Sequence, residues 1–226
     1  MIIPYVKYDE RMRSNIRLLS FFLFGVSTSW IIFAVGTFAV PYVQFSLSML
    51  DRTPFPLALD TETVTYALPH AEPIRLRIPE IGLDVPFEDP LGIDERGVVE
   101  VPKKYTTVGW YRYGPTPGEK GPAVVLGHVD SYKGPAVFHK LPQLNVGDLI
   151  EVEREDGTRA TFIVEHTARY EQDDFPNEIV YGDISYAGLR LVTCMGTFDR
   201  KVQRYSHNLV VFARLIEPER SADANE

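Results

Sequence analysis

The chain has 226 residues, a formal net charge of −8 at pH 7 and a single cysteine, Cys194. This length fits one domain with a hydrophobic core plus some appendages. The acidic balance argues against a nucleic-acid-binding surface, which needs clustered Lys and Arg, and one cysteine excludes an internal disulfide.

The N-terminal part of the sequence predicts a membrane anchor. The run from Leu18 to Val40 carries no charge, and a helix rising about 1.5 Å per residue over this run spans a hydrocarbon core about 30 Å thick. Four basic residues precede it: Lys7, Arg11, Arg13 and Arg17. By the positive-inside rule, residues 1–17 stay in the cytoplasm. We expect 18–40 to be an uncleaved, single-pass anchor in the cell membrane, with the following domain extracellular. A buried soluble helix and a cleaved signal peptide are the alternatives.

Residues 41–71 are rich in proline and poor in pattern, which indicates an extracellular stalk. A folded domain is expected over 72–217, followed by a polar tail at 218–226. Period-two alternation begins at Ile74 to Ile78, which is typical of a half-buried strand. Similar runs recur at 123–127, 149–154, 160–170, 189–194 and 208–215, separated by turn signals. Only short pieces such as Val137 to Leu141 look helical. Several short strands at this spacing predict a closed or nearly closed β-barrel.

Cys194 ends the apolar run LRLVTC, directly before Met195 and Gly196, where we expect the chain to turn. This position places the sulfur near the rim of the barrel, within reach of a substrate. A lone thiol outside the cytoplasm is open to oxidation, and a nucleophilic cysteine needs a base or a cation that favours the thiolate. The pattern favours a nucleophile. The alternative is a buried cysteine that acts as a small apolar side chain.

His128 is the histidine best placed to be the partner of Cys194. The stretch VVLGHVDS runs an apolar strand into Gly127 and presents the imidazole at its end. If the strands that end at His128 and Cys194 are neighbours in the barrel, the two side chains meet. A histidine hydrogen-bonded in a turn with Asp130 and Ser131 is the alternative. The remaining histidines lie in the stalk, the short helical piece, a long strand and a polar loop: His70, His139, His166 and His207.

Other chemistries lack their sequence patterns. No HExxH helix, CxxC pair or second histidine at ligand spacing accompanies His128 and Asp130, and there is no Walker loop, GxGxxG or GxSxG motif. We expect neither a metal nor a cofactor.

Taken together, these segments resemble the sortases, the membrane-anchored cysteine transpeptidases of Gram-positive bacteria. LVTC at Leu191 to Cys194 is similar to the TLxTC motif of the family, with Arg190 in place of its first Thr. VVLGHVDS, RIPEIGLDVP and RYSHNLVVFARL resemble its histidine segment, its barrel entry and its arginine-bearing last strand. GPTPGEKGPAVVLGHVDS, TCMGTFD and NLVVFA most resemble the class F sortases of actinobacteria. The similarity covers about Ile74 to Leu215 and implies a mainly β fold, a closed barrel of about eight strands with short helices.

The resemblance also implies a mechanism. Cys194 would attack the Thr–Gly carbonyl of an LPxTG-like sorting signal and form a thioacyl-enzyme. His128 would protonate the leaving amine and then accept a proton from the incoming amine of a cell-wall precursor such as lipid II, or of a pilin lysine. An arginine would hydrogen-bond the oxyanion. Thr193 would help shape the substrate site.

The arginine is the least constrained of these assignments. Arg204 lies ten residues after Cys194 and suits the position in the family, and Arg200 is the second choice. Many sortases carry this arginine directly before the apolar run of the last strand, where this chain has Asn208. A solvated loop charge is the alternative for either residue.

Two rival functions stay open on the sequence alone. One is another exported cysteine acyl-transferase or hydrolase acting on peptidoglycan peptides; the residues before Cys194 and the order of His and Cys count against it. The other is a membrane-tethered binding domain that does no chemistry, for which Cys194 would be unreactive toward alkylating reagents.

Overall fold

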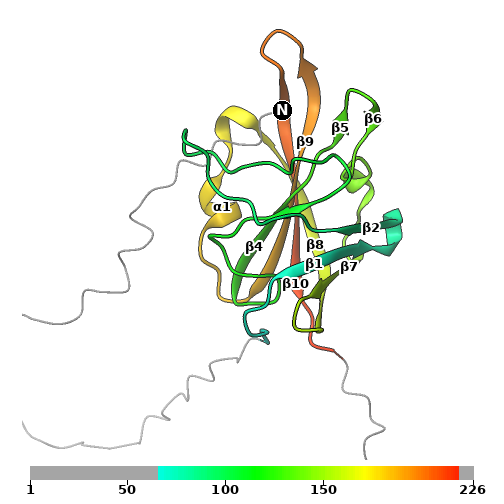
Figure 1. Ribbon diagram of the computed structural model, residues 1–226, viewed down its shortest axis with the longest axis vertical. Coiled ribbons are helices and arrows are strands. Elements are labelled where there is room, and N and C mark those ends of the chain that lie inside the picture. Colours follow the sequence, from blue (N-terminus) through cyan, green and yellow to red (C-terminus); the bar gives the residue numbers. More distant parts are fainter. Residues whose placement is uncertain (1–65, 219–226) are drawn as a thin grey trace, which may run out of the picture. The chain divides into compact units, whose positions relative to one another are not determined.

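The computed structural model describes residues 66–218, and Figure 1 shows their arrangement. The strands are β1 (Pro73–Ile78), β2 (Leu83–Pro86), β3 (Gly109–Trp110), β4 (Gly121–Leu126), β5 (Asp130–Ser131), β6 (Gly134–Pro135), β7 (Leu149–Arg154), β8 (Arg159–Glu171), β9 (Ala187–Asp199) and β10 (Arg204–Leu215). The helical elements are three 3-10 turns, η2 (Pro79–Ile81), η3 (Leu141–Gln143) and η4 (Gln172–Asp174), and the α-helix α1 (Asn177–Tyr181).

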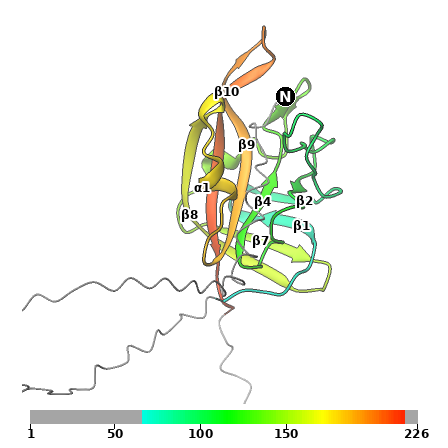
Figure 2. The ribbon, with the colours of Figure 1, turned by 90° about the vertical axis from the view of Figure 1, so that its left-hand side faces the viewer.

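Eight strands form one sheet in the order β2-β1-β7-β8-β10-β9-β4-β3, while β5 and β6 form a separate ribbon. All neighbours in the large sheet are antiparallel except β4 and β9, which are parallel. In Figures 1 and 2, β1 and β2 run across the long strands β8 to β10, so the sheet is strongly curled. Isolated parallel bridges, Phe87 with Val108 and Leu91 with Tyr111, link the chain beyond β2 to β3 and its flanking residues. The mainly β fold is confirmed, but the expected closed barrel is a curled sheet, because no continuous ladder joins β2 to β3 in the described residues.

Both faces of β9 are buried from Ala187 to Cys194. Leu189 and Leu191 enter one hydrophobic cluster, which also takes side chains from β1, β7, β8 and β10. Val192 and Cys194 point to a second cluster on the opposite face. Helix α1 packs against β4 on this second side, and Leu91, in the segment between β2 and β3, joins the same cluster. Cys194 therefore lies under a covered face of the sheet.

The period-two segments are strands in the structure, with differences that have local causes. At the start of β1 the ladder with β7 shifts register between Pro73 and Arg75, and Ile74 is 51% exposed as a result. The predicted helical piece Val137 to Leu141 is instead a turn that leads into η3, where Pro142 occupies the first helical turn.

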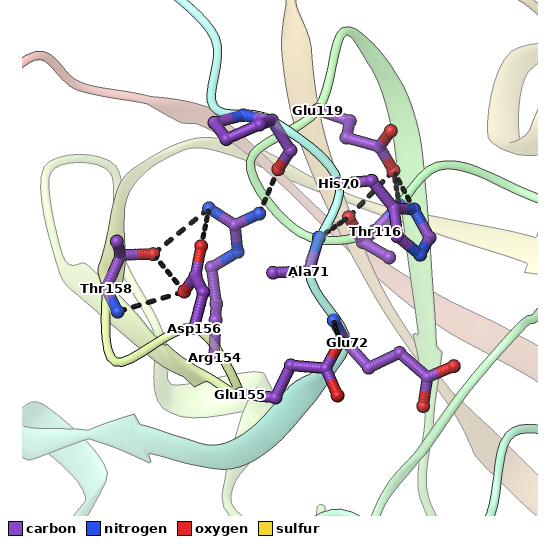
Figure 3. Close-up of polar contacts among 10 residues, drawn as sticks. His70, Ala71, Glu72, Thr116, Glu119, Arg154, Glu155, Asp156 and Thr158 are labelled. Atoms are coloured by element: carbon purple, nitrogen blue, oxygen red, sulfur yellow. Dashed lines mark hydrogen bonds and ion pairs between the residues drawn. The ribbon is translucent and has the colours of Figure 1, made fainter.

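The first described residues are tied to the end of the domain where β4 begins (Figure 3). Leu68 N donates to Gly118 O at 2.8 Å, and Ala71 N donates to Thr116 Oγ1 at 3.3 Å. The buried guanidinium of Arg154 donates to the carbonyl of Pro69. Residues 68–71, which the sequence assigned to the end of the stalk, are therefore hydrogen-bonded to the domain.

The predicted cytoplasmic segment, the membrane anchor and most of the stalk lie outside the described residues, as does nearly all of the polar tail. Between residues 66 and 218, the structure holds no helix with the length and apolar character needed to cross a membrane.

Candidate active site

The parallel pairing of β4 and β9 sets the positions of His128 and Cys194. The last ladder pair is Leu126 with Val192, and Gly127 N donates to Val192 O at 3.2 Å. Each candidate residue follows its strand's last paired residue by two positions. In parallel strands, equal offsets lie at the same level. The structure therefore brings His128 and Cys194 to one edge of the site from neighbouring strands.

The sequence predicted that Cys194 ends its strand, and the structure shows that it does not. Strand β9 runs on to Asp199 and forms a hairpin with β10 that projects beyond the sheet (Figures 1 and 2). The pairing shifts between Tyr205 and His207, and Gly196 has a φ of +88°, which glycine adopts without strain. A Cβ on Gly196 would lie 2.3 Å from Ser206 Oγ. The turn expected at Met195 and Gly196 is thus a β-bulge, and burial ends directly after Cys194.

The thiol of Cys194 is only 1% exposed. Burial raises its pKa to about 12; the negative charge of Asp130 acts in the same direction, while a hydrogen bond from Gln172 opposes them. In that bond, Gln172 Nε2 lies 3.6 Å from Cys194 Sγ. The thiol of Cys194 is therefore protonated at rest.

The imidazole of His128 is buried and held from two sides. Its Nε2 lies 2.7 Å from Pro102 O, and the ring of Tyr105 lies over it with centroids 4.7 Å apart. Because a carbonyl only accepts hydrogen bonds, Nε2 carries the proton in the neutral ring, and Nδ1 is the basic nitrogen. Burial lowers the pKa of His128, against the opposing effect of the Pro102 carbonyl. At rest the thiol of Cys194 and the imidazole of His128 are therefore both uncharged.

Asp130 supplies a negative charge near both groups. Its carboxylate accepts a hydrogen bond from the Tyr205 hydroxyl, which comes from β10. The charge raises the pKa of both His128 and Cys194, although burial is the larger influence on each. The same carboxylate, together with burial, raises the pKa of Tyr205. The sequence considered Asp130 as part of a turn and as a metal ligand beside His128, both of which it left without support; its contact with Tyr205, 75 residues away in β10, carries no local signal.

Two small residues set the strand ends that carry the pair. Thr193 is fully buried, and its Oγ1 donates to Gly127 O at 2.8 Å. A Cβ on Gly127 would lie 2.4 Å from the ring of Phe138, whose backbone N donates to His128 O at 2.8 Å. The predicted contact of Thr193 with substrate stays a prediction. The hydrogen bond that the structure shows joins the strand of Cys194 to the strand of His128.

The two predicted arginines lie on the projecting hairpin. Arg204 begins β10 and pairs with Asp199, roughly 15 Å along the strand from Cys194. Its guanidinium forms a two-pronged ion pair with Asp173, with N to O distances of 2.7 and 2.9 Å. Arg200 lies in the hairpin turn, exposed, and lines a cavity of about 430 Å³ with Asp130 and Tyr205. In this arrangement no contact joins either guanidinium to the thiol among the described residues, and their oxyanion role stays a prediction.

Two side-chain amides lie near the sulfur, those of Gln172 and Asn208. The sequence noted Asn208 only as the residue that stands where many sortases carry arginine, and it missed Gln172. Gln172 lies in η4, outside any motif, and carried no sequence signal. Asn208 pairs directly with Cys194 across β9 and β10, and only the register of the hairpin shows this. The other histidines lie elsewhere: His70 contacts Glu119, and His166 stacks on Phe212.

Comparison with known proteins identifies the family. The model of the sortase domain matches residues 76–216, while no curated protein matches the chain. Among solved structures, sortase C1 of Streptococcus agalactiae has a TM-score of 0.50 and 22% identity, covering 66% of this chain and 69% of that one. Sortase C-1 of Actinomyces oris has a TM-score of 0.48 and 20% identity, with coverages of 65% and 76%. Sortase D5 of Clostridium perfringens, a transpeptidase, has 0.46 and 16%, with coverages of 65% and 79%. Because the family model matches more than half of the sequence, the chain belongs to the sortase family of cysteine transpeptidases.

Proposed function

We propose that this sortase cleaves an LPxTG-like sorting signal between Thr and Gly, with Cys194 as the nucleophile and His128 as the general acid and base. The observation that carries this proposal is the equal offset of the two residues beyond the paired ends of β4 and β9. It supports a direct proton transfer between them. The acceptor is a primary amine on a cell-wall precursor or on a pilin lysine.

Acylation begins from the uncharged pair. The thiol proton moves to Nδ1 of His128 as Sγ bonds to the carbonyl carbon, and the carbonyl π electrons move to the oxygen. When this intermediate collapses, the C–N bond breaks, and the leaving amine takes the proton from His128. The acceptor amine then attacks the thioester and gives one proton to His128. Cleavage of the C–S bond frees the thiolate, which recovers that proton.

The oxyanion of each intermediate needs hydrogen-bond donors. Arg204 is the first candidate donor from the sequence and Arg200 the second, and alanine variants of each test their part in acylation. Thr193 supports the geometry of the site through its bond to Gly127.

The finer assignments are part of the same proposal. The motifs GPTPGEKGPAVVLGHVDS and TCMGTFD favour class F. The uncharged run at 18–40 favours a membrane anchor, with 1–17 cytoplasmic, 41–71 as a stalk and the domain outside the cell. In intact cells that express the protein with an epitope tag at its N-terminus, protease treatment should then remove the domain and leave the tag protected. Loss of both, or of neither, would contradict this topology.

The first experiment is intact-mass spectrometry of the full-length protein in mild detergent, incubated with an LPxTG-containing peptide. We expect a mass gain equal to the acyl portion of the peptide, absent from Cys194→Ala. Diglycine or triglycine should discharge the adduct. If the wild-type protein forms no adduct while Cys194 is still alkylated, the proposed sorting signal is wrong.

A further inference from the structure

Two buried side-chain amides border the sulfur of Cys194. Gln172 comes from η4 and Asn208 from β10, and they are 6% and 0% exposed. Gln172 Nε2 lies 3.6 Å from Cys194 Sγ and 3.4 Å from Asn208 Oδ1. Asn208 and Cys194 are directly opposite in the antiparallel ladder, which places their Cβ atoms about 5 Å apart on one face. The three residues form one polar cluster inside an otherwise apolar region.

The N–H donors of this cluster are arranged to bind a strong acceptor, which the protonated sulfur does not provide. The sulfur of a thiol is a weak acceptor, so Gln172 gains little from facing it. Asn208 Nδ2 is buried and has no hydrogen-bond partner among residues 66–218. Leaving such a buried donor unsatisfied destabilises the folded protein. Both donors would gain a strong acceptor if a negatively charged oxygen formed beside the sulfur.

We propose that the side-chain amides of Gln172 and Asn208 are the donors that stabilise the oxyanion of the acylation intermediate. This inference rests on the proposed role of Cys194 as nucleophile. The oxyanion is attached to the carbon that bonds to Sγ. A donor already 3.6 Å from the sulfur therefore needs only a small shift to reach the separation of about 2.7–3.1 Å typical of such bonds.

The amides neither gain nor lose a proton in this step. As the C–S bond forms, the carbonyl π electrons move to oxygen, and the N–H groups of Gln172 and Asn208 donate to it. When the electrons return and the C–N bond breaks, the proton for the leaving amine comes from His128. Amide donors do not change protonation state across the working pH range. The pH dependence of acylation therefore comes from His128 and Cys194.

Arg204 has a different place in this arrangement. Its partner Asp173 is the residue after Gln172 in η4, so the ion pair connects the projecting hairpin to the turn that carries Gln172. Asp173 is 76% exposed and Arg204 35%, and exposed ion pairs of this kind contribute little to stability. Under this proposal Arg204 acts through Asp173 as a positioning residue and not as the oxyanion donor.

The test compares acylation with alkylation of the same thiol. Alkylation by iodoacetamide consumes the sulfur but forms no oxyanion, whereas acylation by the LPxTG peptide does. We expect Gln172→Met, which keeps the length and removes the donor, to slow single-turnover acylation about 100-fold or more. Alkylation should stay within about threefold of the wild-type rate. Gln172→Glu is the second variant, because it keeps the shape if the methionine variant does not fold.

Asn208→Leu should slow acylation by at least tenfold with the same unchanged alkylation, and Arg204→Ala by less than tenfold. Gln143→Met in η3, distant in sequence from the cluster, is the matched control and should change neither rate. Equal losses in acylation and alkylation would overturn the inference, because they indicate a structural role. So would unchanged acylation in Gln172→Met, or a loss of 100-fold in Arg204→Ala alone.

An activated ester such as a p-nitrophenyl ester separates this inference from the proposed sorting signal. It acylates a thiol through the same kind of intermediate without peptide recognition. If the peptide gives no adduct in the wild-type protein, the proposed substrate is wrong, but the ester still measures the amides. Equal ester acylation of the wild-type protein and Gln172→Met would then overturn the amide role by itself.

Discussion

The thiol of Cys194 is buried and, with a pKa raised to about 12, protonated at neutral pH. A rise of about three units lowers the thiolate fraction about a thousandfold, and the greater nucleophilicity of a more basic thiolate recovers part of that. We expect iodoacetamide to alkylate Cys194 roughly 50-fold more slowly than free cysteine at pH 7.5, with the rate still rising at pH 10. Intact-mass kinetics measure this. A rate that levels off near neutral pH would mean that the resting site holds a thiolate–imidazolium pair instead.

If His128 is the general base, as proposed, its protonation sets the acid side of the activity profile. Burial lowers its pKa below the usual value of about 6.5, so the imidazole is already neutral and able to accept a proton at pH 7. We expect kcat/KM for acylation to be level above neutral pH and to fall with one proton below pH 6.5.

The control for this profile is Asp130→Asn, which removes a charge that raises the pKa of His128. The acid limb should then move to still lower pH. An inflection above pH 6.5 in the wild-type protein, or a shift of the limb upward in the variant, would contradict the assignment of the base.

At the scale of elements, the site depends on how the ends of β4 and β9 are joined. The buried hydroxyl of Thr193 donates to Gly127 O. Thr193→Val keeps the shape but leaves this buried carbonyl without that donor, at a cost of about 1–3 kcal/mol. We expect a lower free energy of unfolding in urea titrations and slower acylation. Thr193→Ser, which retains the hydroxyl, should lose less of both; equal losses would exclude the hydrogen bond as the cause.

Gly127 has a second structural task, since its backbone lies against Phe138. A Cβ at this position would meet the ring at 2.4 Å, and overpacking of this kind costs about 1–3 kcal/mol. We expect Gly127→Ala to lower the melting temperature. It should also slow acylation, because the backbone N of the displaced Phe138 donates a hydrogen bond to His128 O. Adding Phe138→Leu should restore part of the stability. No recovery in the double variant would show that the clash lies elsewhere.

Some elements follow from local sequence and others do not. Strand β7 coincides with the predicted LIEVER because alternation of polar and apolar residues directly specifies a half-buried strand. The sequence missed the end of β9 after Cys194 and the start of β10 before Asn208. These two pieces form the exposed hairpin, which has no buried face and therefore no alternation of polar and apolar residues. Helix α1 has only five residues, too few to show a helical period.

At the scale of the whole molecule, hydrogen bonds hold residues 68–71 against the domain at the end of β4 that lies opposite the site. Strand β4 has six residues, which separates its two ends by about 20 Å. The buried Arg154 donates to the Pro69 carbonyl and to Thr158 Oγ1 there (Figure 3). We expect Arg154→Met to lower the free energy of unfolding by about 1–3 kcal/mol and to expose the chain near Pro69 to limited proteolysis. Acylation by the folded protein should not change.

The matched control is Arg159→Met, which removes an exposed arginine that pairs with Glu151 at 3.3 Å. Surface ion pairs contribute little, so its stability should stay within about 0.5 kcal/mol of the wild-type protein. If both variants lose the same stability, the buried bond to Pro69 has no special part in holding residues 68–71.

The sequence by itself determined the mainly β fold, the sortase family and the two candidate residues, Cys194 and His128. Strand periodicity, a lone cysteine and a strand-end histidine are local patterns, which can be recognised in the sequence without knowledge of the tertiary structure. Only the tertiary structure decided what surrounds them. The register of β9 and β10 sets Asn208 opposite Cys194, the turn at η4 brings Gln172 to the sulfur, and Asp173 engages Arg204. These contacts join residues far apart in sequence, so they depend on how strands pair and curl and not on any pattern along the chain.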